Sequence, residues 1–162
     1  MLVLGRSLTN RLGGKLTGMK VLGINHIGIA PKDPAKANWF FKTVLGVPFL
    51  GEELVTQQKT NTFMYDLTGP VSDKIPRVEI LENRSSVEEP GPIAKFLEKK
   101  GGGVHHIAVA VDNINEAIAT MKAYQVELVD ENPKRGAHNT LVAFVHPRST
   151  GGILVELVQE AF

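Results

Sequence analysis

The chain of 162 residues contains no cysteine. Disulfides and thiolate ligands are therefore excluded, and any bound metal must be held by imidazole, carboxylate, amide or water. No apolar run approaches the roughly 18 residues that cross a membrane. Because 18 basic residues nearly balance 17 acidic ones, the charge pattern favours neither nucleic acid nor a membrane surface as a partner. These absences favour a small-molecule partner and a reducing interior compartment, the cytoplasm.

Acidic residues are also missing from positions 1–20, which carry four basic ones. We interpret this segment as a basic N-terminal extension; the alternative is a short organellar targeting segment, which would place the protein in the mitochondrial matrix. Residues 21–162 are expected to form a single domain. It comprises module one at 21–82, a linker helix at 91–101 and module two at 103–160.

A repeated motif is the most informative feature. The string NHIGIA at 25–30 is echoed by HHIAVA at 105–110. Glu79 follows His26 by 53 residues and Glu156 follows His106 by 50, each glutamate in an apolar run. A lone strand histidine or glutamate is usually structural. Two matched His and Glu pairs instead predict one metal site shared between two halves of the domain.

The hydrophobic pattern predicts the same order of elements in both halves, βαβββ. In module one we expect a helix at 35–45, begun by Asp33 and Pro34, and strands at 21–30, 47–50, 60–67 and 77–81. In module two we expect a helix at 113–123 and strands at 103–111, 126–129, 140–145 and 153–159. A curved sheet carrying the two histidines and two glutamates on its concave face would bring all four together.

Two imidazoles and two carboxylates accept one divalent ion such as Co²⁺, Mn²⁺, Ni²⁺ or Zn²⁺, without selecting among them. Such an ion can hold a substrate carbonyl and take up the charge formed when the adjacent C–H loses its proton. That chemistry also needs a base beside the substrate. His105, His138 and His146 are expected to have structural or supporting roles.

The strings INHIGIA, PGPIAKFLEKKGGGVHHIAVAVDNI and FVHPRSTGGILVELVQ resemble the vicinal oxygen chelate superfamily, and within it the methylmalonyl-CoA epimerase family. The resemblance implies an α+β fold of two tandem βαβββ modules that form a curved mixed sheet around a metal site. It implies His26, Glu79, His106 and Glu156 as metal ligands and Glu156 as a catalytic base. It also implies an acyl-CoA substrate, and we expect a homodimer.

Two departures from the family pattern keep alternatives open. Some epimerases have Gln at the position of Glu79 and a further catalytic Glu on the preceding strand, whereas 59–65 contains no carboxylate. The second acid or base is therefore unassigned, with water, His138, Glu52, Glu53 and Asp66 as candidates. The His-Glu-His-Glu set also resembles lactoylglutathione lyase (glyoxalase I), which acts on a glutathione thiohemiacetal. A non-catalytic ligand-binding or resistance protein is the third alternative. Lys134, Arg135 and Arg148 are candidate contacts for CoA phosphates.

Overall fold

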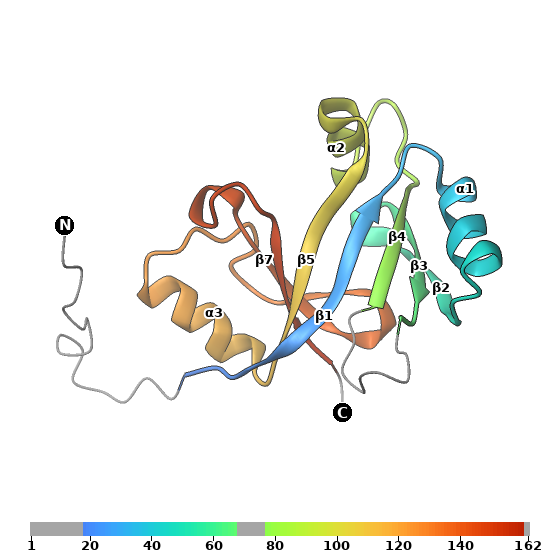
Figure 1. Ribbon diagram of the computed structural model, residues 1–162. Helices are drawn as coiled ribbons and strands as arrows, with labels where there is room; N and C mark the ends of the chain where they lie inside the picture. The colour runs from blue at the N-terminus through green and yellow to red at the C-terminus, as the bar shows by residue number, and fades with distance from the viewer. Residues whose placement is uncertain (1–17, 68–76, 161–162) are drawn as a thin grey trace, which may run out of the picture.

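The computed structural model describes residues 18–67 and 77–160, and its centre is one eight-stranded sheet with the order β2-β3-β4-β1-β5-β8-β7-β6 (Figure 1). The strands are β1 (Val21–Ala30), β2 (Phe49–Val55), β3 (Thr60–Tyr65), β4 (Arg77–Asn83), β5 (Gly103–Val111), β6 (Lys134–Arg135), β7 (Leu141–Val145) and β8 (Val155–Gln159). The α-helices are α1 (Pro34–Trp39), α2 (Pro92–Lys100) and α3 (Ile114–Ala123). Single helical turns occupy η2 (Phe40–Val44), η3 (Thr56–Gln58), η4 (Ala137–Asn139) and η5 (Pro147–Ser149).

The sheet repeats one pattern about its centre. β1 pairs antiparallel with β5, and each has a parallel partner on its other side, β4 for β1 and β8 for β5. Two antiparallel strands then complete each half. The predicted α+β class with two βαβββ modules in a curved mixed sheet is thus confirmed.

The helices α3 and α1 each cover an apolar cluster, one in each module. Ile114, Ala117 and Ile118 of α3 pack with Leu157 of β8. Around α1 and the turn that follows it, Phe41 packs against a cluster centred on Tyr65, Val78 and Ile80. Burial of these apolar side chains stabilises each half separately. The polar side chains of the sheet between the two clusters are therefore not needed for packing.

The first helix begins as predicted and ends differently. Asp33 accepts a hydrogen bond from the Lys36 N–H at 2.9 Å, and Pro34 takes the first helical position. After Trp39 the chain widens into a π-helical turn, in which the Leu45 N–H donates to the Phe40 carbonyl, 2.9 Å away. The predicted helix at 35–45 is therefore an α-helix followed by one π turn.

The predicted strand at 126–129 is wrong. Only Leu128 forms a bridge, to Val145, and the strand that extends β7 is the two-residue β6. After Leu128, the buried carboxylate of Asp130 is paired with Lys134 and accepts a hydrogen bond from the Phe144 N–H of β7. This ion pair holds Lys134 at the edge of the sheet, where Lys134 is the backbone partner of Val142 on β7.

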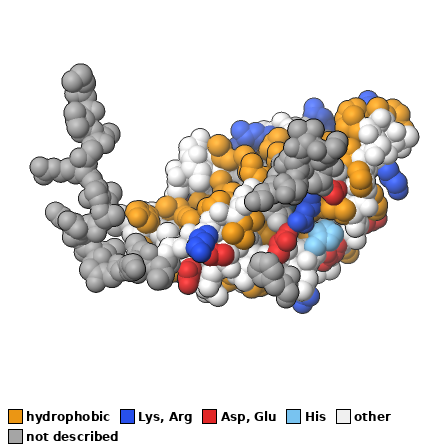
Figure 2. Space-filling model, turned by 60° about the horizontal axis from the view of Figure 1, so that its bottom comes forward, with side chains coloured by type: hydrophobic (Ala, Val, Ile, Leu, Met, Phe, Trp, Pro, Cys, Tyr) orange, Lys and Arg blue, Asp and Glu red, His pale blue; other side chains and the backbone are white. Residues whose placement is uncertain are grey.

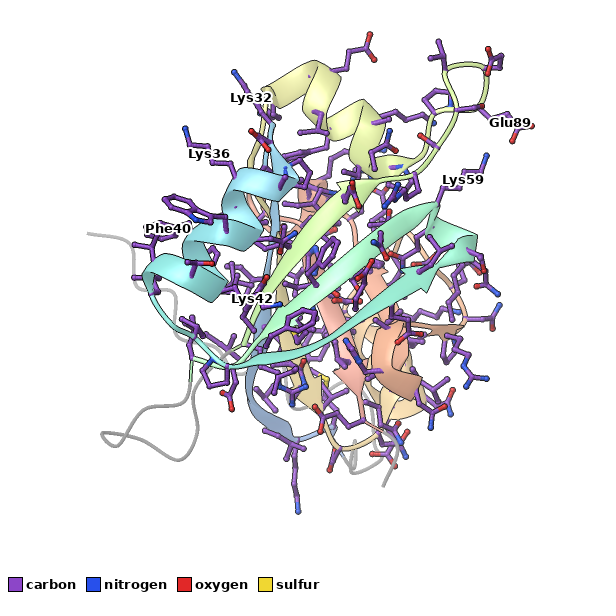
Figure 3. All side chains as sticks on the ribbon, turned by 90° about the vertical axis from the view of Figure 1, so that its right-hand side faces the viewer. Lys32, Lys36, Phe40, Lys42, Lys59 and Glu89 are labelled. Atoms are coloured by element: carbon purple, nitrogen blue, oxygen red, sulfur yellow. The ribbon has the colours of Figure 1, made fainter. Side chains whose placement is uncertain are left out.

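Two connections tie peripheral segments to the sheet. Lys59, at the tip of the β2-β3 hairpin, forms an ion pair of 2.6 Å with Glu89 in the segment before α2 (Figure 3).

Most of the predicted extension at 1–20 lies outside the described residues. Of its last residues, Met19 packs on the α3 cluster and Lys20 N donates to Asp112 at 2.7 Å. No helix in the described part of the chain is long and apolar enough to cross a membrane.

Candidate metal centre

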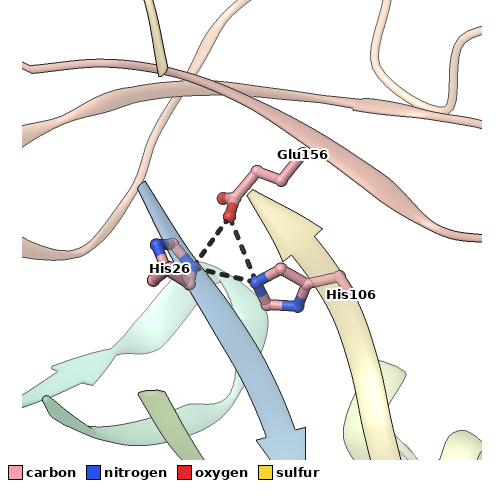
Figure 4. A group of neighbouring side chains, drawn as sticks. All are labelled: His26, His106 and Glu156. Atoms are coloured by element: carbon pink, nitrogen blue, oxygen red, sulfur yellow. Dashed lines mark hydrogen bonds and ion pairs between the residues drawn. The ribbon is translucent and has the colours of Figure 1, made fainter. Parts of the chain in front are cut away.

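The four side chains predicted as ligands meet on one face of the sheet. His26, Glu79, His106 and Glu156 come from β1, β4, β5 and β8, the four central strands, and all are buried. The Nε2 atoms of His26 and His106 lie 3.0 Å apart, and each lies 3.2 Å from Glu156 Oε2 (Figure 4). Glu79 Oε2 lies 3.4 Å from His26 Nε2 and 3.8 Å from His106 Nε2.

Strand register explains why these residues converge. Gly28 pairs with both Glu79 on β4 and His106 on β5, and its counterpart Ala108 pairs with His26 on β1 and Glu156 on β8. Cross-strand partners point to the same face of a sheet. Gly28 thus lies between Glu79 and His106, and Ala108 lies between His26 and Glu156.

Gly28 also makes room for an imidazole. A Cβ atom at this position would lie 2.2 Å from Cε1 of His106, far inside van der Waals contact. The His106 ring therefore occupies the space that any other residue at 28 would fill. The signal for this in the sequence is a glycine two residues after His26 within a strand.

The electrostatics of the cluster match a site for a cation. Burial lowers the pKa of His26, but Glu156 and Glu79 raise it to about 10 overall. Burial raises the pKa of Glu156, but His106 and His26 lower it to about 2. The side chains thus hold a positive charge between two carboxylates, as a bound divalent ion would.

Glu156 gives a test of whether the residues fit a metal. Its Oε2 is buried and accepts no hydrogen bond among the described residues, although two imidazole nitrogens lie 3.2 Å from it. A buried carboxylate oxygen without a hydrogen bond is costly unless it serves another partner. His26, His106 and Glu156 present ligand atoms within 4.8 Å of one another. Their geometry and chemistry fit a first-row divalent ion.

The remaining histidines have distinct places. His105 contacts the His106 ring and packs edge-on against Phe96 of α2. Burial lowers the pKa of His105 to about 4, with His106 adding to the effect. His138 lines the cavity over the cluster. His146 lies elsewhere and accepts a hydrogen bond from Arg148 N.

The cavity above the cluster is lined by residues of both modules. Beyond the four central residues, its titratable side chains in the described part of the chain are Arg77 and His138. A second, more apolar cavity shares Gln58, His106 and Phe144 with the first. Lys134 and Arg135 line this second cavity, whereas Arg148 pairs with Glu127 at 3.1 Å and lines neither.

The described residues lining the two cavities do not include Glu52, Glu53 and Asp66, three candidates for the second acid or base. Glu52 accepts a hydrogen bond from Asn61 at 2.6 Å. Glu53 instead accepts one from His138 N, also at 2.6 Å. Among the titratable candidates, His138 is thus the described residue that reaches the cavity.

Known proteins resemble this chain over most of its length. Residues 25–144 match the model of the Glyoxalase/Bleomycin resistance protein/Dioxygenase superfamily. The chain is 37% identical to the uncharacterized protein YqjC of Bacillus subtilis over 84% of its own length and 91% of that protein. It is 37% identical to the mitochondrial methylmalonyl-CoA epimerase of Bos taurus, over 84% of this chain and 73% of the other. A solved methylmalonyl-CoA epimerase in complex with methylmalonyl-CoA and NH4+ superposes with a TM-score of 0.79 at 27% identity, covering 88% of this chain and 96% of the other.

Proposed function

Because the chain belongs to the Glyoxalase/Bleomycin resistance protein/Dioxygenase superfamily, we propose that it is a metal-dependent epimerase of an acyl-CoA thioester, most specifically of methylmalonyl-CoA. The observation that carries the proposal is the convergence of His26, His106 and Glu156, with an oxygen of Glu156 left without a hydrogen bond. Similarity to proteins named methylmalonyl-CoA epimerase supports the choice of substrate.

In this proposal His26, Glu79, His106 and Glu156 hold one divalent ion, Co²⁺, Mn²⁺, Ni²⁺ or Zn²⁺. When bound, the ion supplies a Lewis acid that stabilises negative charge on the thioester carbonyl oxygen. His106→Ala removes one ligand and is expected to lower both metal content and activity. Elemental analysis of this variant, beside His146→Ala as the control histidine, tests the assignment; unchanged metal content in His106→Ala contradicts it.

The protein's own groups move the proton. A Glu156 carboxylate oxygen takes the α-proton, and the electron pair of the broken C–H bond delocalises into the thioester as an enolate. Inversion then requires a proton donor on the opposite face of that planar enolate. We assign this role to His138, which lines the same cavity. Its imidazolium donates the proton to Cα, and solvent restores both groups.

The second, more apolar cavity suits the CoA part of the thioester. Its wall is largely apolar, and it adjoins the cluster through His106 and Phe144. Lys134 and Arg135 give it two cationic side chains, of which Lys134 is paired with the carboxylate of Asp130 and Arg135 donates to Asn139 at 2.9 Å. We propose that the CoA part of the thioester occupies this cavity. Its phosphate groups would face these two cationic side chains.

Incubation of the metal-loaded protein with one epimer of methylmalonyl-CoA in D₂O tests the reaction. We expect deuterium at the α-carbon and formation of the other epimer. A parallel assay offers the glutathione thiohemiacetal of methylglyoxal. Isomerisation of that compound without exchange in the thioester would favour a lactoylglutathione lyase, and turnover of neither would favour a ligand-binding protein.

We also propose a homodimer acting in a reducing interior compartment. Hydrophobic side chains occupy a large part of the face in Figure 2, and the start of β1 exposes more than half of Val21, Leu22 and Ile24. Exposed apolar surface of this kind favours contact with a second copy. Sedimentation equilibrium of the protein beside Leu22→Glu tests this, and a monomer at micromolar concentration contradicts it.

A further inference from the structure

The pairing of β1 with β5 has three register shifts, one of them at Val21–Gly23 near the start of β1, and the other two lie at equivalent positions of the two modules. On β1, Ile24 and His26 pair with the consecutive residues Val109 and Ala108, which leaves Asn25 as an extra residue. On β5, His106 and Val104 pair with the consecutive residues Gly28 and Ile29, which leaves His105 as the extra one. Each module thus has a β-bulge at the residue before its central histidine. Bulges redirect side chains and are frequent beside active sites.

Each bulged residue contacts the ring of the histidine that follows it. Asn25 Oδ1 lies 2.9 Å from His26 Nδ1, and His105 Nδ1 lies 2.9 Å from His106 Nδ1. In a regular strand, neighbouring side chains point to opposite faces. The bulges allow two consecutive side chains to meet. In both modules the contact uses Nδ1 and leaves Nε2 facing the cluster.

From this repeated geometry we propose that Asn25 and His105 are positioning residues that fix the tautomer and orientation of the two metal-binding imidazoles. The inference rests on the proposed metal function. A metal binds the unprotonated nitrogen of a neutral imidazole, so a ligand that binds through Nε2 must carry its proton on Nδ1. Asn25 Oδ1 accepts that proton from His26. His105 accepts the equivalent proton from His106 through its unprotonated Nδ1. Such outer partners typically contribute ten- to a hundredfold in metal affinity.

The environment holds both positioning side chains in place. The amide nitrogen of Asn25 donates to Glu160 Oε1 at 2.8 Å, so its oxygen is the atom that faces His26. Glu160 is itself paired with Arg77 at 2.5 Å. On the other side, the ring of Phe96 packs edge-on against His105 with 4.9 Å between ring centroids. Neither side chain can turn away without losing a second contact.

Paired substitutions test the proposal. Asn25→Leu and His105→Phe remove the acceptor, whereas Asn25→Asp and His105→Gln keep an oxygen acceptor. Asn61→Leu is the matched control, because Asn61 is a buried strand amide that contacts Glu52 rather than an imidazole. Co²⁺ affinity is measured by competition with a chelator. Histidine ¹⁵N shifts of the Zn²⁺-loaded protein report the tautomer, and circular dichroism confirms folding.

We expect Asn25→Leu and His105→Phe to weaken Co²⁺ binding about ten- to a hundredfold, with His105→Gln recovering part of the loss and Asn61→Leu causing none. In the zinc-loaded variants the Nδ1–H signal of the neighbouring histidine should shift or broaden. Unchanged affinity and ¹⁵N shifts in folded variants overturn the positioning role alone. Equal weakening by Asn61→Leu also overturns it, because the effect would then be structural. If the unmodified chain binds neither ion, the proposed function fails and this inference with it.

Discussion

Glu53 and His138 join the two ends of the sheet. The His138 N–H donates to Glu53 Oε2 at 2.6 Å, and the His138 Nδ1 atom lies 3.7 Å from the same oxygen. Glu53 belongs to β2, one edge strand, while His138 follows β6, the strand at the opposite edge. The contact therefore spans the open side of the curved sheet and places an imidazole over the cavity.

The backbone at this contact is unusual. His138 and Asn139 have φ values of 53° and 60°, in the left-handed region that few non-glycine residues adopt. Such conformations cost on the order of 1 kcal/mol or more and concentrate at functional sites. The hydrogen bond to Glu53 holds the backbone of His138, and this arrangement sets the direction of its ring.

His138→Ala should separate proton exchange from inversion. With Glu156 intact, the α-proton of one epimer still exchanges with D₂O, while conversion into the other epimer falls by about 10²- to 10⁴-fold, the usual contribution of a general acid or base. His146→Ala is the control, because this histidine lies outside the cavity. Chiral analysis of the product beside deuterium incorporation makes the measurement. An equal loss of exchange and inversion in His138→Ala contradicts a separate role for this residue.

Glu156→Gln should abolish α-proton exchange of the epimer whose α-proton faces Glu156, because the base for that epimer is removed. The amide keeps the size of the side chain but cannot accept the proton, and one metal ligand is weakened at the same time. Asp66→Asn should retain at least part of the activity, because Asp66 is not among the described residues that line the cavity. The exchange rate in D₂O is measured for both variants at saturating metal. If Asp66→Asn binds metal normally and keeps exchange but loses inversion, Asp66 rather than His138 is the second group.

Gly28→Ala tests the space required by the His106 ring. A methyl group there would lie 2.2 Å from that ring, so the imidazole must move away from His26 and Glu156. We expect a loss of Co²⁺ affinity of about tenfold or more, comparable with removal of an outer partner of a ligand. Gly23→Ala is the control, because a Cβ there would meet no atom within 4 Å. Its φ of 144° is unfavourable to alanine, whereas Gly28 has no positive φ, so an effect of backbone strain alone would appear in the control. Equal affinities of the two variants contradict the steric explanation.

The repeat allowed much of the fold and the convergence of the cluster to be predicted. The bounds of β1 and β5 follow from mainly apolar runs, each interrupted by one polar pair, Asn25-His26 or His105-His106. Their duplication implied two equivalent halves, whose central strands then had to lie together. The roles of His26, Glu79, His106 and Glu156 as ligands stay a prediction, although the structure brings their side chains together.

What could not be predicted depends on contacts between distant segments. The strand β6 has only two residues, both charged, and so carries no alternating apolar pattern. The bulges at Asn25 and His105 arise from the register between two strands, which neither strand reveals alone. Likewise, Glu53 and His138 are 85 residues apart, and only closure of the curved sheet brings them together.

The metal-free protein should have a characteristic dependence of stability on pH. The pKa of His26 is raised from 6.5 to about 10 on folding, so its stabilising effect is complete below pH 6.5 and is lost as the pH rises towards 10. The pKa of Glu156 is lowered from 4.5 to about 2, so its effect is complete above pH 4.5 and is lost as the pH falls towards 2. Together, the two effects mean that the cluster contributes most to the free energy of unfolding between pH 4.5 and 6.5.

Urea unfolding of chelator-treated protein at a series of pH values measures this dependence. Comparison with His26→Gln isolates the alkaline arm, because glutamine cannot hold the additional proton. We expect the difference in unfolding free energy between the two proteins to shrink steadily from pH 6.5 to 10. A difference that stays constant over this range would show that His26 is not protonated between the two carboxylates. In the unmodified chain, Zn²⁺ should reduce the loss of stability between pH 6.5 and 10. The ion replaces the proton of His26 in balancing the charges of Glu79 and Glu156.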